Sequence, residues 1–337
     1  MGMRQTARII LSLALMLFGG APSHAASLEF KPRELFRIPF GKEPGALGAR
    51  LEGGNFIIPR TFSIDNAGHF YIDDTNKRRI ARYSPAGAYQ MEFRYLATAR
   101  QVFAQPDSRE NLWLLISDPA QGMYYGVFDP RGRSLRSGIF SRFNQFILHL
   151  DDDGTLRVIL TSEKDPATHQ TYVLDEKALL MKKLSIARPP ENHHEIRHSE
   201  RTYYMDPLPG ASQGDGRPVT RITDPAHRAI ADIPGDVIYI TGRGEIYTRT
   251  GPREIRIYDL AGFLKGKITL KGLRSACSAL RFDSNGSLYE LDGIPDQSDD
   301  DLRRAGVTPG GSIDFEDLHY TPAMTGMRLI QWERINR

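Results

Sequence analysis

The chain has 337 residues, 25% of them charged, and a formal net charge of +3 at pH 7. Arg4 and Arg8 lie in an N-terminal leader, so the rest of the chain carries only +1, that is, +3 less these two charges. A charge this small lacks the basic footprint of a nucleic-acid-binding protein, and we expect no nucleic-acid partner. Cys277 is the only cysteine, so no intramolecular disulfide can form. We expect Cys277 to be a small buried hydrophobe and an extended core to supply the stability.

Residues 1–25 have the pattern of a secretory signal peptide. A positively charged start is followed by the apolar stretch Ile9–Phe18 and by a small-x-small cleavage site at Ser23–Ala25. The apolar stretch is shorter than the roughly 20 residues that span a bilayer, and no later segment reads as a membrane span. We expect cleavage near Ala25 and a secreted or periplasmic protein whose residues 26–337 form a single domain.

A turn signature recurs about every 44 residues along this domain. In its clearest form, an Asp is followed three residues later by Gly and after three more by an aromatic residue. Asp hydrogen-bonds the backbone of such turns, and Gly adopts the left-handed conformation that closes a hairpin. The six copies begin at Asp65, Asp107, Asp151, Arg197, Thr241 and Asp283. The period predicts an all-β protein, a six-bladed β-propeller of four-stranded antiparallel blades.

The first copy shows how one blade is built. Alternating residues predict strands over 61–64, 69–72, 79–83 and 88–93. One tight turn joins the first strand to the second, and another joins the third to the fourth. The second turn also recurs, with an aromatic residue four positions before Gly, at Tyr83–Gly87, Phe128–Gly132 and Tyr258–Gly262. Two turns that keep their mutual spacing indicate one unit copied several times, with the fourth copy the most degenerate.

The segment Pro59–Ile80 closely resembles an NHL repeat. It runs from Pro through an Asp-x-x-Gly turn and a Tyr to an Asp, and then to Asn and Arg-Ile. Asp74 and Arg79 keep the spacing of that family, whereas Asn76 stands one position early. The preceding Phe40–Gly48 looks like the Gly-rich loop that leads into such repeats. The resemblance is strongest in this copy, moderate in the sixth copy and weak between them.

The resemblance implies a structure and a general function. Asp74 and Arg79 would form an opposite-charge pair between neighbouring strands of the blade. The N-terminal segment Leu35–Pro39 would close the ring as an outer strand beside Met327–Trp332. Because the family mostly serves as an interaction scaffold, we expect an exported propeller that binds a small molecule, a peptide or an envelope protein through its channel or its face loops. The face loops are expected at Arg188–Arg201, Pro207–Pro225 and Ile294–Tyr320.

The register of the repeats identifies candidate binding residues. The residue two positions before each turn falls on the predicted innermost strand, between mostly apolar neighbours, so alternation directs it toward the central channel. These channel-lining candidates are Ser63, Gln105, His149, Glu195, Tyr239 and Arg281. They form a small-molecule site or merely bind channel water, and the sequence leaves both alternatives open.

Two of these candidates also suit catalysis. His149 and Glu195 on adjacent blades would serve as an acid–base pair or as two metal ligands. Tyr239 and Arg281 would then hold an anion. The alternative hypothesis is therefore a propeller enzyme with a divalent metal in the channel, similar to lactonase-like hydrolases or lyases. No catalytic residue is assigned, no cofactor is required by the binding hypothesis, and whether the protein is an enzyme stays open.

Two motif matches have structural explanations. His194–His198 matches the zinc-protease pattern, which needs a helix, whereas the repeat register predicts an inner strand that runs into a turn. Gly210–Gly214 matches a nucleophile elbow, but prolines and glycines around it predict a loop.

Overall fold

The computed structural model describes residues 28–335 except for the segments 53–54, 60, 96–98, 100, 119–121, 141–144, 151–155, 162–168, 184–193, 199–200, 213–217, 225, 227, 242–243, 252–253, 271–278, 284 and 296–323. Every regular element in these described ranges is a β-strand. None of the described residues belongs to a helix long and apolar enough to cross a membrane. The predicted leader and Cys277 lie outside the described residues.

Within the described residues, the strands form six four-stranded antiparallel sheets and one short hairpin. Sheets 1 to 3 consist of β4 (Phe62–Ile64), β5 (Phe70–Asp74), β6 (Arg79–Tyr83), β7 (Tyr89–Arg94); β8 (Gln101–Pro106), β9 (Leu112–Asp118), β10 (Gly122–Phe128), β11 (Ser134–Phe140); and β12 (Gln145–Leu150), β13 (Leu156–Thr161), β14 (His169–Asp175), β15 (Leu180–Lys183). Sheets 4 and 5 consist of β16 (His194–His198), β17 (Arg201–Ser212), β18 (Pro218–Thr223), β19 (Ala229–Pro234); and β20 (Asp236–Ile240), β21 (Ile246–Gly251), β22 (Glu254–Tyr258), β23 (Leu264–Thr269). Sheet 6 consists of β24 (Ala279–Phe282), β25 (Leu288–Pro295), β26 (Met324–Ile335) and β1 (Glu29–Pro39), while β2 (Arg50–Glu52) and β3 (Asn55–Ile57) form the hairpin.

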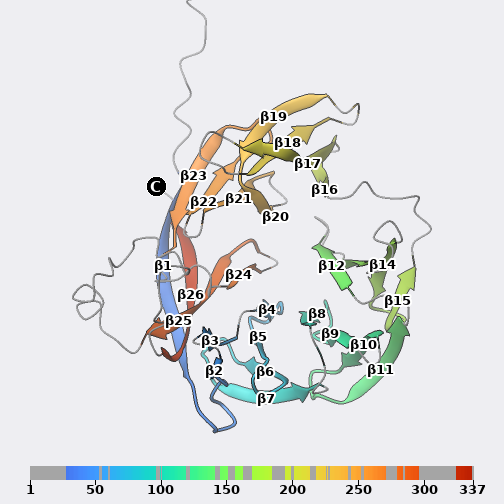
Figure 1. Cartoon of the computed structure of the whole chain (residues 1–337), viewed down its shortest axis with the longest axis vertical. Coiled ribbons are helices and arrows are strands. Elements are labelled where there is room, and N and C mark those ends of the chain that lie inside the picture. The colour runs from blue at the N-terminus through green and yellow to red at the C-terminus, as the bar shows by residue number, and fades with distance from the viewer. Residues whose placement is uncertain are drawn as a thin grey trace, which may run out of the picture.

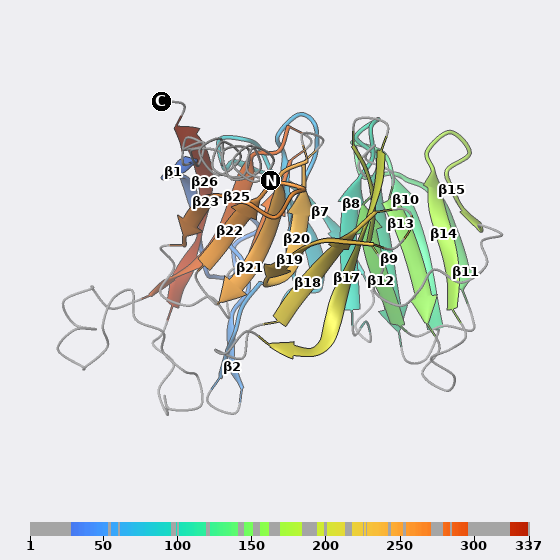
Figure 2. The same ribbon diagram turned by 90° about the horizontal axis from the view of Figure 1, so that it is seen from above.

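The sheets are arranged as the blades of a propeller. Their first strands, such as β4, β8 and β24, lie toward a common centre, and later strands lie toward the outside (Figure 1). Turned by 90°, the same sheets stand side by side in one layer (Figure 2). The structure confirms an all-β propeller of four-stranded antiparallel blades, and the four strands predicted in the first copy are present with boundaries within two residues.

The recurring Asp caps the turn and also binds the aromatic residue that follows. Asp65 Oδ1 accepts hydrogen bonds from the backbone N–H groups of Ala67 (3.0 Å) and His69 (2.8 Å), and the Tyr71 hydroxyl donates to Asp65 Oδ2 (3.1 Å). Equivalent side-chain bonds join Trp113 Nε1 to Asp107 (3.0 Å) and the Tyr289 hydroxyl to Asp283 (3.2 Å). One carboxylate thus satisfies the turn and the buried aromatic residue together, which explains why the sequence signature couples them.

The N-terminal strand joins the two ends of the chain. β1 pairs antiparallel with β26, with Phe36 opposite Leu329 and Ile38 opposite Met327, so the predicted outer strand is confirmed. Phe36 also stacks on Tyr83 of sheet 1, with ring centroids 6.4 Å apart. On the other side, the Leu28 N–H donates to Lys265 O of sheet 5 (2.8 Å). β1 therefore contacts both neighbours of the sheet that it completes.

The hydrophobic core is divided among the contacts between sheets. Separate clusters of buried side chains join sheet 6 to sheet 1, sheet 1 to sheet 2, sheet 2 to sheet 3, sheet 4 to sheet 5, and sheet 5 to sheet 6. Each large aliphatic or aromatic side chain buried there contributes about 1.5–3 kcal/mol. Side-chain packing thus joins these five pairs of neighbouring sheets, while hydrogen bonds hold the strands within each sheet.

Two of the three expected face loops contain strands. β16 lies within Arg188–Arg201, and β17 and β18 fill most of Pro207–Pro225. The loop prediction for Pro207–Pro225 is therefore wrong in its described part, because β17 continues past its prolines through a break in register between Pro207 and Ser212. Most of the third segment, from 296 onward, lies outside the described residues.

Candidate functional site

The six predicted binding residues all lie on the first strands of their sheets. Ser63 is in β4, Gln105 in β8 and Arg281 in β24, and β4 contacts both β8 and β24. His149 lies in β12 and Glu195 in β16, where the structure describes the backbone but not these side chains. The inner-strand placement agrees with the sequence analysis, and a role of these residues in binding stays a prediction.

Packing shows where the inner-strand side chains point. Phe62 and Ile64 belong to the cluster with sheet 6, so alternation along β4 turns Ser63 toward sheet 2. Leu280 and Phe282 belong to the cluster with sheet 5, so Arg281 turns toward sheet 1. Both side chains therefore point along the ring toward the following sheet. The sequence predicts that the apolar neighbours pack against a sheet and that the polar residues face the central channel. In β4 and β24 the polar residues instead face the following sheet.

Tyr239 is packed against the neighbouring sheet. Its ring stacks on that of Phe282, with centroids 3.9 Å apart and an angle of 8° between the planes. It also meets Tyr247 edge-on at 6.2 Å. A register shift between Val237 and Tyr239 accompanies this placement. The stack makes Tyr239 part of the contact between sheets 5 and 6.

Ser63 and Arg281 have unmet hydrogen-bonding capacity. Ser63 is only 4% exposed, and its Oγ has no hydrogen-bond partner among the described residues. Arg281 donates from Nη1 to Leu280 O (2.8 Å), and desolvation lowers its pKa from the ordinary value. In the described part of the chain no carboxylate forms an ion pair with this guanidinium. Polar groups of this kind are costly to bury unless something pairs with them.

The structure also accounts for the two motif matches. The zinc-protease pattern forms strand β16, so His194 and His198 are about 13 Å apart along it, too far for one ion. Gly210–Ser212 forms the end of β17, and the rest of the elbow pattern lies outside the described residues. Among the residues that the structure describes, no cluster of three or more His, Cys, Asp or Glu side chains could hold a metal ion.

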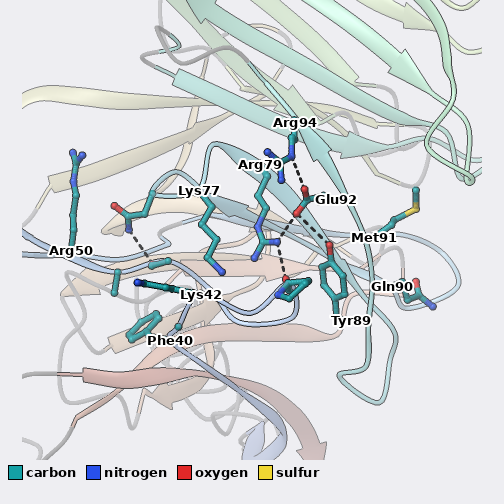
Figure 3. Close-up of a pocket in the computed structure, with 15 residues that line it drawn as sticks. Phe40, Lys42, Arg50, Lys77, Arg79, Tyr89, Gln90, Met91, Glu92 and Arg94 are labelled. Atoms are coloured by element: carbon teal, nitrogen blue, oxygen red, sulfur yellow. Dashed lines mark hydrogen bonds and ion pairs between the residues drawn. The ribbon is translucent and has the colours of Figure 1, made fainter.

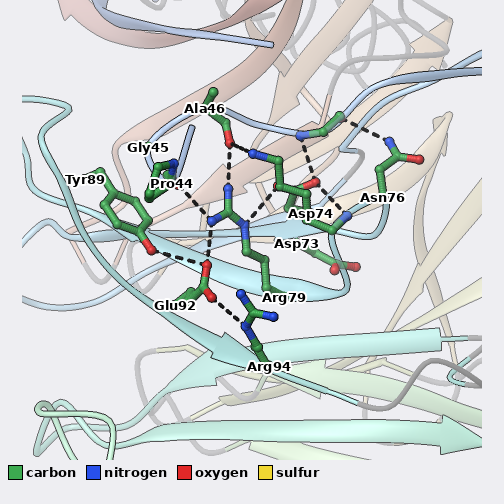
Figure 4. Close-up of polar contacts among 12 residues, drawn as sticks. Pro44, Gly45, Ala46, Asp73, Asp74, Asn76, Arg79, Tyr89, Glu92 and Arg94 are labelled. Atoms are coloured by element: carbon green, nitrogen blue, oxygen red, sulfur yellow. Dashed lines mark hydrogen bonds and ion pairs between the residues drawn. The ribbon is translucent and has the colours of Figure 1, made fainter. Parts of the chain in front are cut away.

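Arg79 forms a buried network at the outer part of sheet 1 (Figure 4). Its side chain is 3% exposed, and Nε donates to Asp74 Oδ2 at 3.1 Å, which confirms the predicted ion pair. Nη1 donates to Glu92 Oε2 (2.6 Å) and Pro44 O (2.7 Å), and Nη2 donates to Ala46 O (2.6 Å). The hydrogen bond from Arg79 is the largest of the effects that together lower the pKa of Glu92. Arg79 thus fixes the Gly-rich loop against the blade.

Gly48 allows this close approach. A Cβ atom at this position would lie 2.7 Å from Asn76 Cβ and 2.8 Å from Asp74 Oδ1, so any larger residue requires a shift. The Gly48 N–H donates to Asp74 Oδ1 (3.0 Å), while Asn76 Nδ2 donates to the oxygens of Gly48 (3.0 Å) and Ile57 (2.9 Å). The early position of Asn76 is therefore compatible with a role in holding the loop.

A pocket of about 1160 Å³ opens beside this network. Its walls come from the Gly-rich loop, the turn after β5, and β7. Figure 3 shows Lys42, Lys77 and Tyr89 in its middle, Arg50 toward one end and Gln90 with Met91 toward the other. The sequence analysis missed this pocket because its walls come from three separated segments. A signal was present in Lys42, Arg50 and Lys77, which gather positive charge around a Gly-rich loop.

Comparisons with known proteins find only distant structural likenesses. No protein-family model matches the chain. No curated protein matches it either. A streptogramin B lyase structure is similar at 10% identity and TM-score 0.40, over 93% of this chain and 100% of that one. A catalytically inactive virginiamycin B lyase from Staphylococcus aureus with quinupristin is similar at 9% identity and TM-score 0.44, over 91% of this chain and 100% of that one. The PQQ-bound aldose sugar dehydrogenase from Streptomyces coelicolor is similar at 11% identity and TM-score 0.44, over 90% of this chain and 99% of that one. Likenesses at this level assign no activity to the chain.

Proposed function

We propose that this protein is an exported, NHL-like, six-bladed propeller that binds a ligand through the inner strands around its centre. Six four-stranded sheets and the pairing of β1 with β26 support a closed ring. The ligand is a small molecule or a peptide with an anionic group, held where β24 contacts β4. An envelope protein that presents such a group is a partner of the same kind.

One observation carries this proposal. Arg281 places a half-buried guanidinium on the inner strand β24, turned toward β4 of sheet 1 and without an ion-pair partner among the described residues. A guanidinium binds carboxylate or phosphate through two parallel hydrogen bonds. Binding an anion there would supply the charge-assisted hydrogen bonds that Arg281 lacks among the described residues.

The test compares two arginine variants with citrate as the probe. We expect citrate, at constant ionic strength, to raise the midpoint of thermal unfolding because it binds the folded state. Arg281→Gln should lose most of this shift, whereas Arg136→Gln, on the exposed strand β11, should keep it. Equal shifts in both variants and the unchanged protein would contradict the proposal. Export is tested separately, by N-terminal sequencing of mature protein from the periplasm or medium, which should begin near Ala26.

A further inference from the structure

The outer strand of sheet 2 has a free edge. In the described part of the chain, β11 pairs only with β10, and it lies on the outer rim of the ring (Figure 1). Residues 134–137 and Ile139 of this strand are exposed. Alternate N–H and C=O groups of an edge strand point away from its own sheet, so the edge of β11 can accept another strand.

The outer strands of the other sheets carry residues that discourage such pairing. Proline and charged side chains protect a sheet edge, since neither suits the interior of a larger sheet. These residues are Pro32 and Pro39 in β1, Glu92 and Arg94 in β7, Lys182 and Lys183 in β15, Asp232 and Pro234 in β19, and Lys265 and Lys267 in β23. β11 has no proline and a single charged residue, Arg136, whose Nη1 donates to Ala178 O of sheet 3 (2.9 Å).

One face of β11 is also apolar at both ends. Alternation places Leu135, Ser137 and Ile139 on one face of the strand and Arg136 and Gly138 on the other. Leu135 is 43% exposed and Ile139 is 73% exposed. Two exposed apolar side chains thus lie on either side of one small polar side chain.

This arrangement is complementary to itself. If two copies of β11 pair antiparallel about a twofold axis at Ser137, Leu135 of each copy lies opposite Ile139 of the other, on the same face. Ser137 then meets Ser137 at the axis, where two small side chains fit. Arg136 lies opposite Gly138, so no like charges are directly opposite each other. A twofold interface requires such a surface, since both copies contribute the same residues to it.

We propose that β11 pairs antiparallel with β11 of a second copy of this chain, so that the two four-stranded sheets join into one. A contact limited to two seven-residue strands is smaller than the roughly 1,200–2,000 Å² of a stable interface, so the dimer is reversible and depends on concentration. β11 and the inner strand β8 are the two opposite edges of sheet 2. The dimer therefore leaves the inner strands free, and it does not depend on anion binding at Arg281.

Sedimentation measurements on charge variants test the proposal. The unchanged protein should show a monomer–dimer equilibrium between about 1 µM and about 1 mM, the range expected for a small interface. Ser137→Lys places two like charges opposite each other at the axis and should raise the dissociation constant about tenfold or more, as should Ser137→Glu. Mixing the two variants should restore association as a heterodimer, because opposite charges then face each other.

A matched control locates the interface. Thr269→Lys adds the same charge at an exposed position of the outer strand β23 and should leave the dissociation constant unchanged. Thermal unfolding of each variant establishes that the fold is intact. If a Ser137 variant fails to fold, Ile139→Thr replaces it, since this change removes only exposed apolar surface and should still weaken the dimer.

Four results would overturn the proposal. They are a chain that stays monomeric at every concentration, equal weakening by Thr269→Lys, a mixture of the Ser137 variants that associates no better than either alone, and full association of Ile139→Thr. A strictly monomeric chain would leave the edge of β11 to an extended segment of a different protein.

Discussion

Sheets 1 and 6 contain the same ion pair in two different settings. Asp74 lies opposite Arg79 in register, and Asp292 lies opposite Arg328. Both pairs are close, at 3.1 Å and 2.7 Å, but Arg79 is 3% exposed whereas Arg328 is 25% exposed. Arg79 also binds two carbonyl oxygens of the Gly-rich loop. The ion pair is therefore present with or without a covering loop. In sheet 1 the Gly-rich loop binds over it, so Arg79 is buried and also lines the pocket.

The largest expected difference between the two sheets is the effect of removing the arginine. Arg79→Ala leaves Asp74 buried and unpaired and frees the loop, so we expect it to lower the free energy of unfolding by about 3–5 kcal/mol. Arg328→Ala also removes a partner from a buried aspartate, Asp292, but Arg328 itself is partly exposed and no loop is freed, so we expect a smaller cost of about 1–3 kcal/mol. Urea unfolding of both variants measures the difference. Similar losses in the two variants would show that the loop adds nothing to the pair.

The two sheets should both make stability depend on pH. Burial raises the pKa of Asp73 to about 7 and that of Glu290 to about 7. Tyr95 donates to Asp73 (2.7 Å) and Trp332 donates to Glu290 (3.1 Å), but these bonds offset desolvation only in part. The folded state keeps these protons between about pH 4 and 7, whereas the unfolded chain loses them. The free energy of unfolding should therefore fall as the pH rises through this window.

Substitution separates the two contributions to this pH dependence. For each group we expect a fall of about 3 kcal/mol between pH 5 and pH 8, because one pKa unit corresponds to 1.36 kcal/mol. Glu290→Gln should remove the part due to sheet 6, and Asp73→Asn the part due to sheet 1. Glu333→Gln, at a surface position of β26, is the control. A stability profile that stays unchanged in both buried variants would refute this explanation.

A smaller difference is expected from the hydroxyl groups that bind the turn residues. Tyr71→Phe removes a buried hydrogen bond to Asp65 and should cost about 1 kcal/mol. Tyr247→Phe is the matched control in sheet 5, where Thr241 takes the place of the Asp and accepts from the Glu245 N–H. Thermal unfolding of both variants checks the proposed coupling. Equal losses would mean that the aspartate is not the important partner.

The sequence predicted the features that depend on short-range spacing. The turn at Asp65–Gly68, the ion pair of Asp74 with Arg79 and the four strands of the first copy all lie within one repeat. The pairing of β1 with β26 followed from the implied closure of the ring. These features were accessible because turn chemistry and strand alternation act over a few residues.

The features that sequence reasoning missed depend on contacts between distant segments. Arg328 was not matched to Asp292 because the two residues are 36 positions apart, across the insertion in the last copy. The turn of Tyr239 toward Phe282 depends on a local register shift that its residue types do not reveal. The pocket was missed because its walls meet only in the folded chain.

The metal-dependent alternative depends on His149 and Glu195, whose side chains lie outside the structural description. Elemental analysis of the purified protein distinguishes it from the binding proposal. One tightly held zinc or calcium ion per chain would support the metal site, whereas the binding proposal expects substoichiometric metal. If the His149→Ala variant no longer holds this ion, His149 is one of the metal-coordinating residues.

The most direct test of the propeller account is urea unfolding of a shortened chain that begins at Gly48, compared with one that begins at Ala26. Removing β1 deletes the outer strand of sheet 6 and its contacts with sheets 1 and 5. We predict a lower midpoint and loss of the single cooperative transition. The same midpoint and the same cooperativity in both chains would contradict a ring joined by its N-terminal strand.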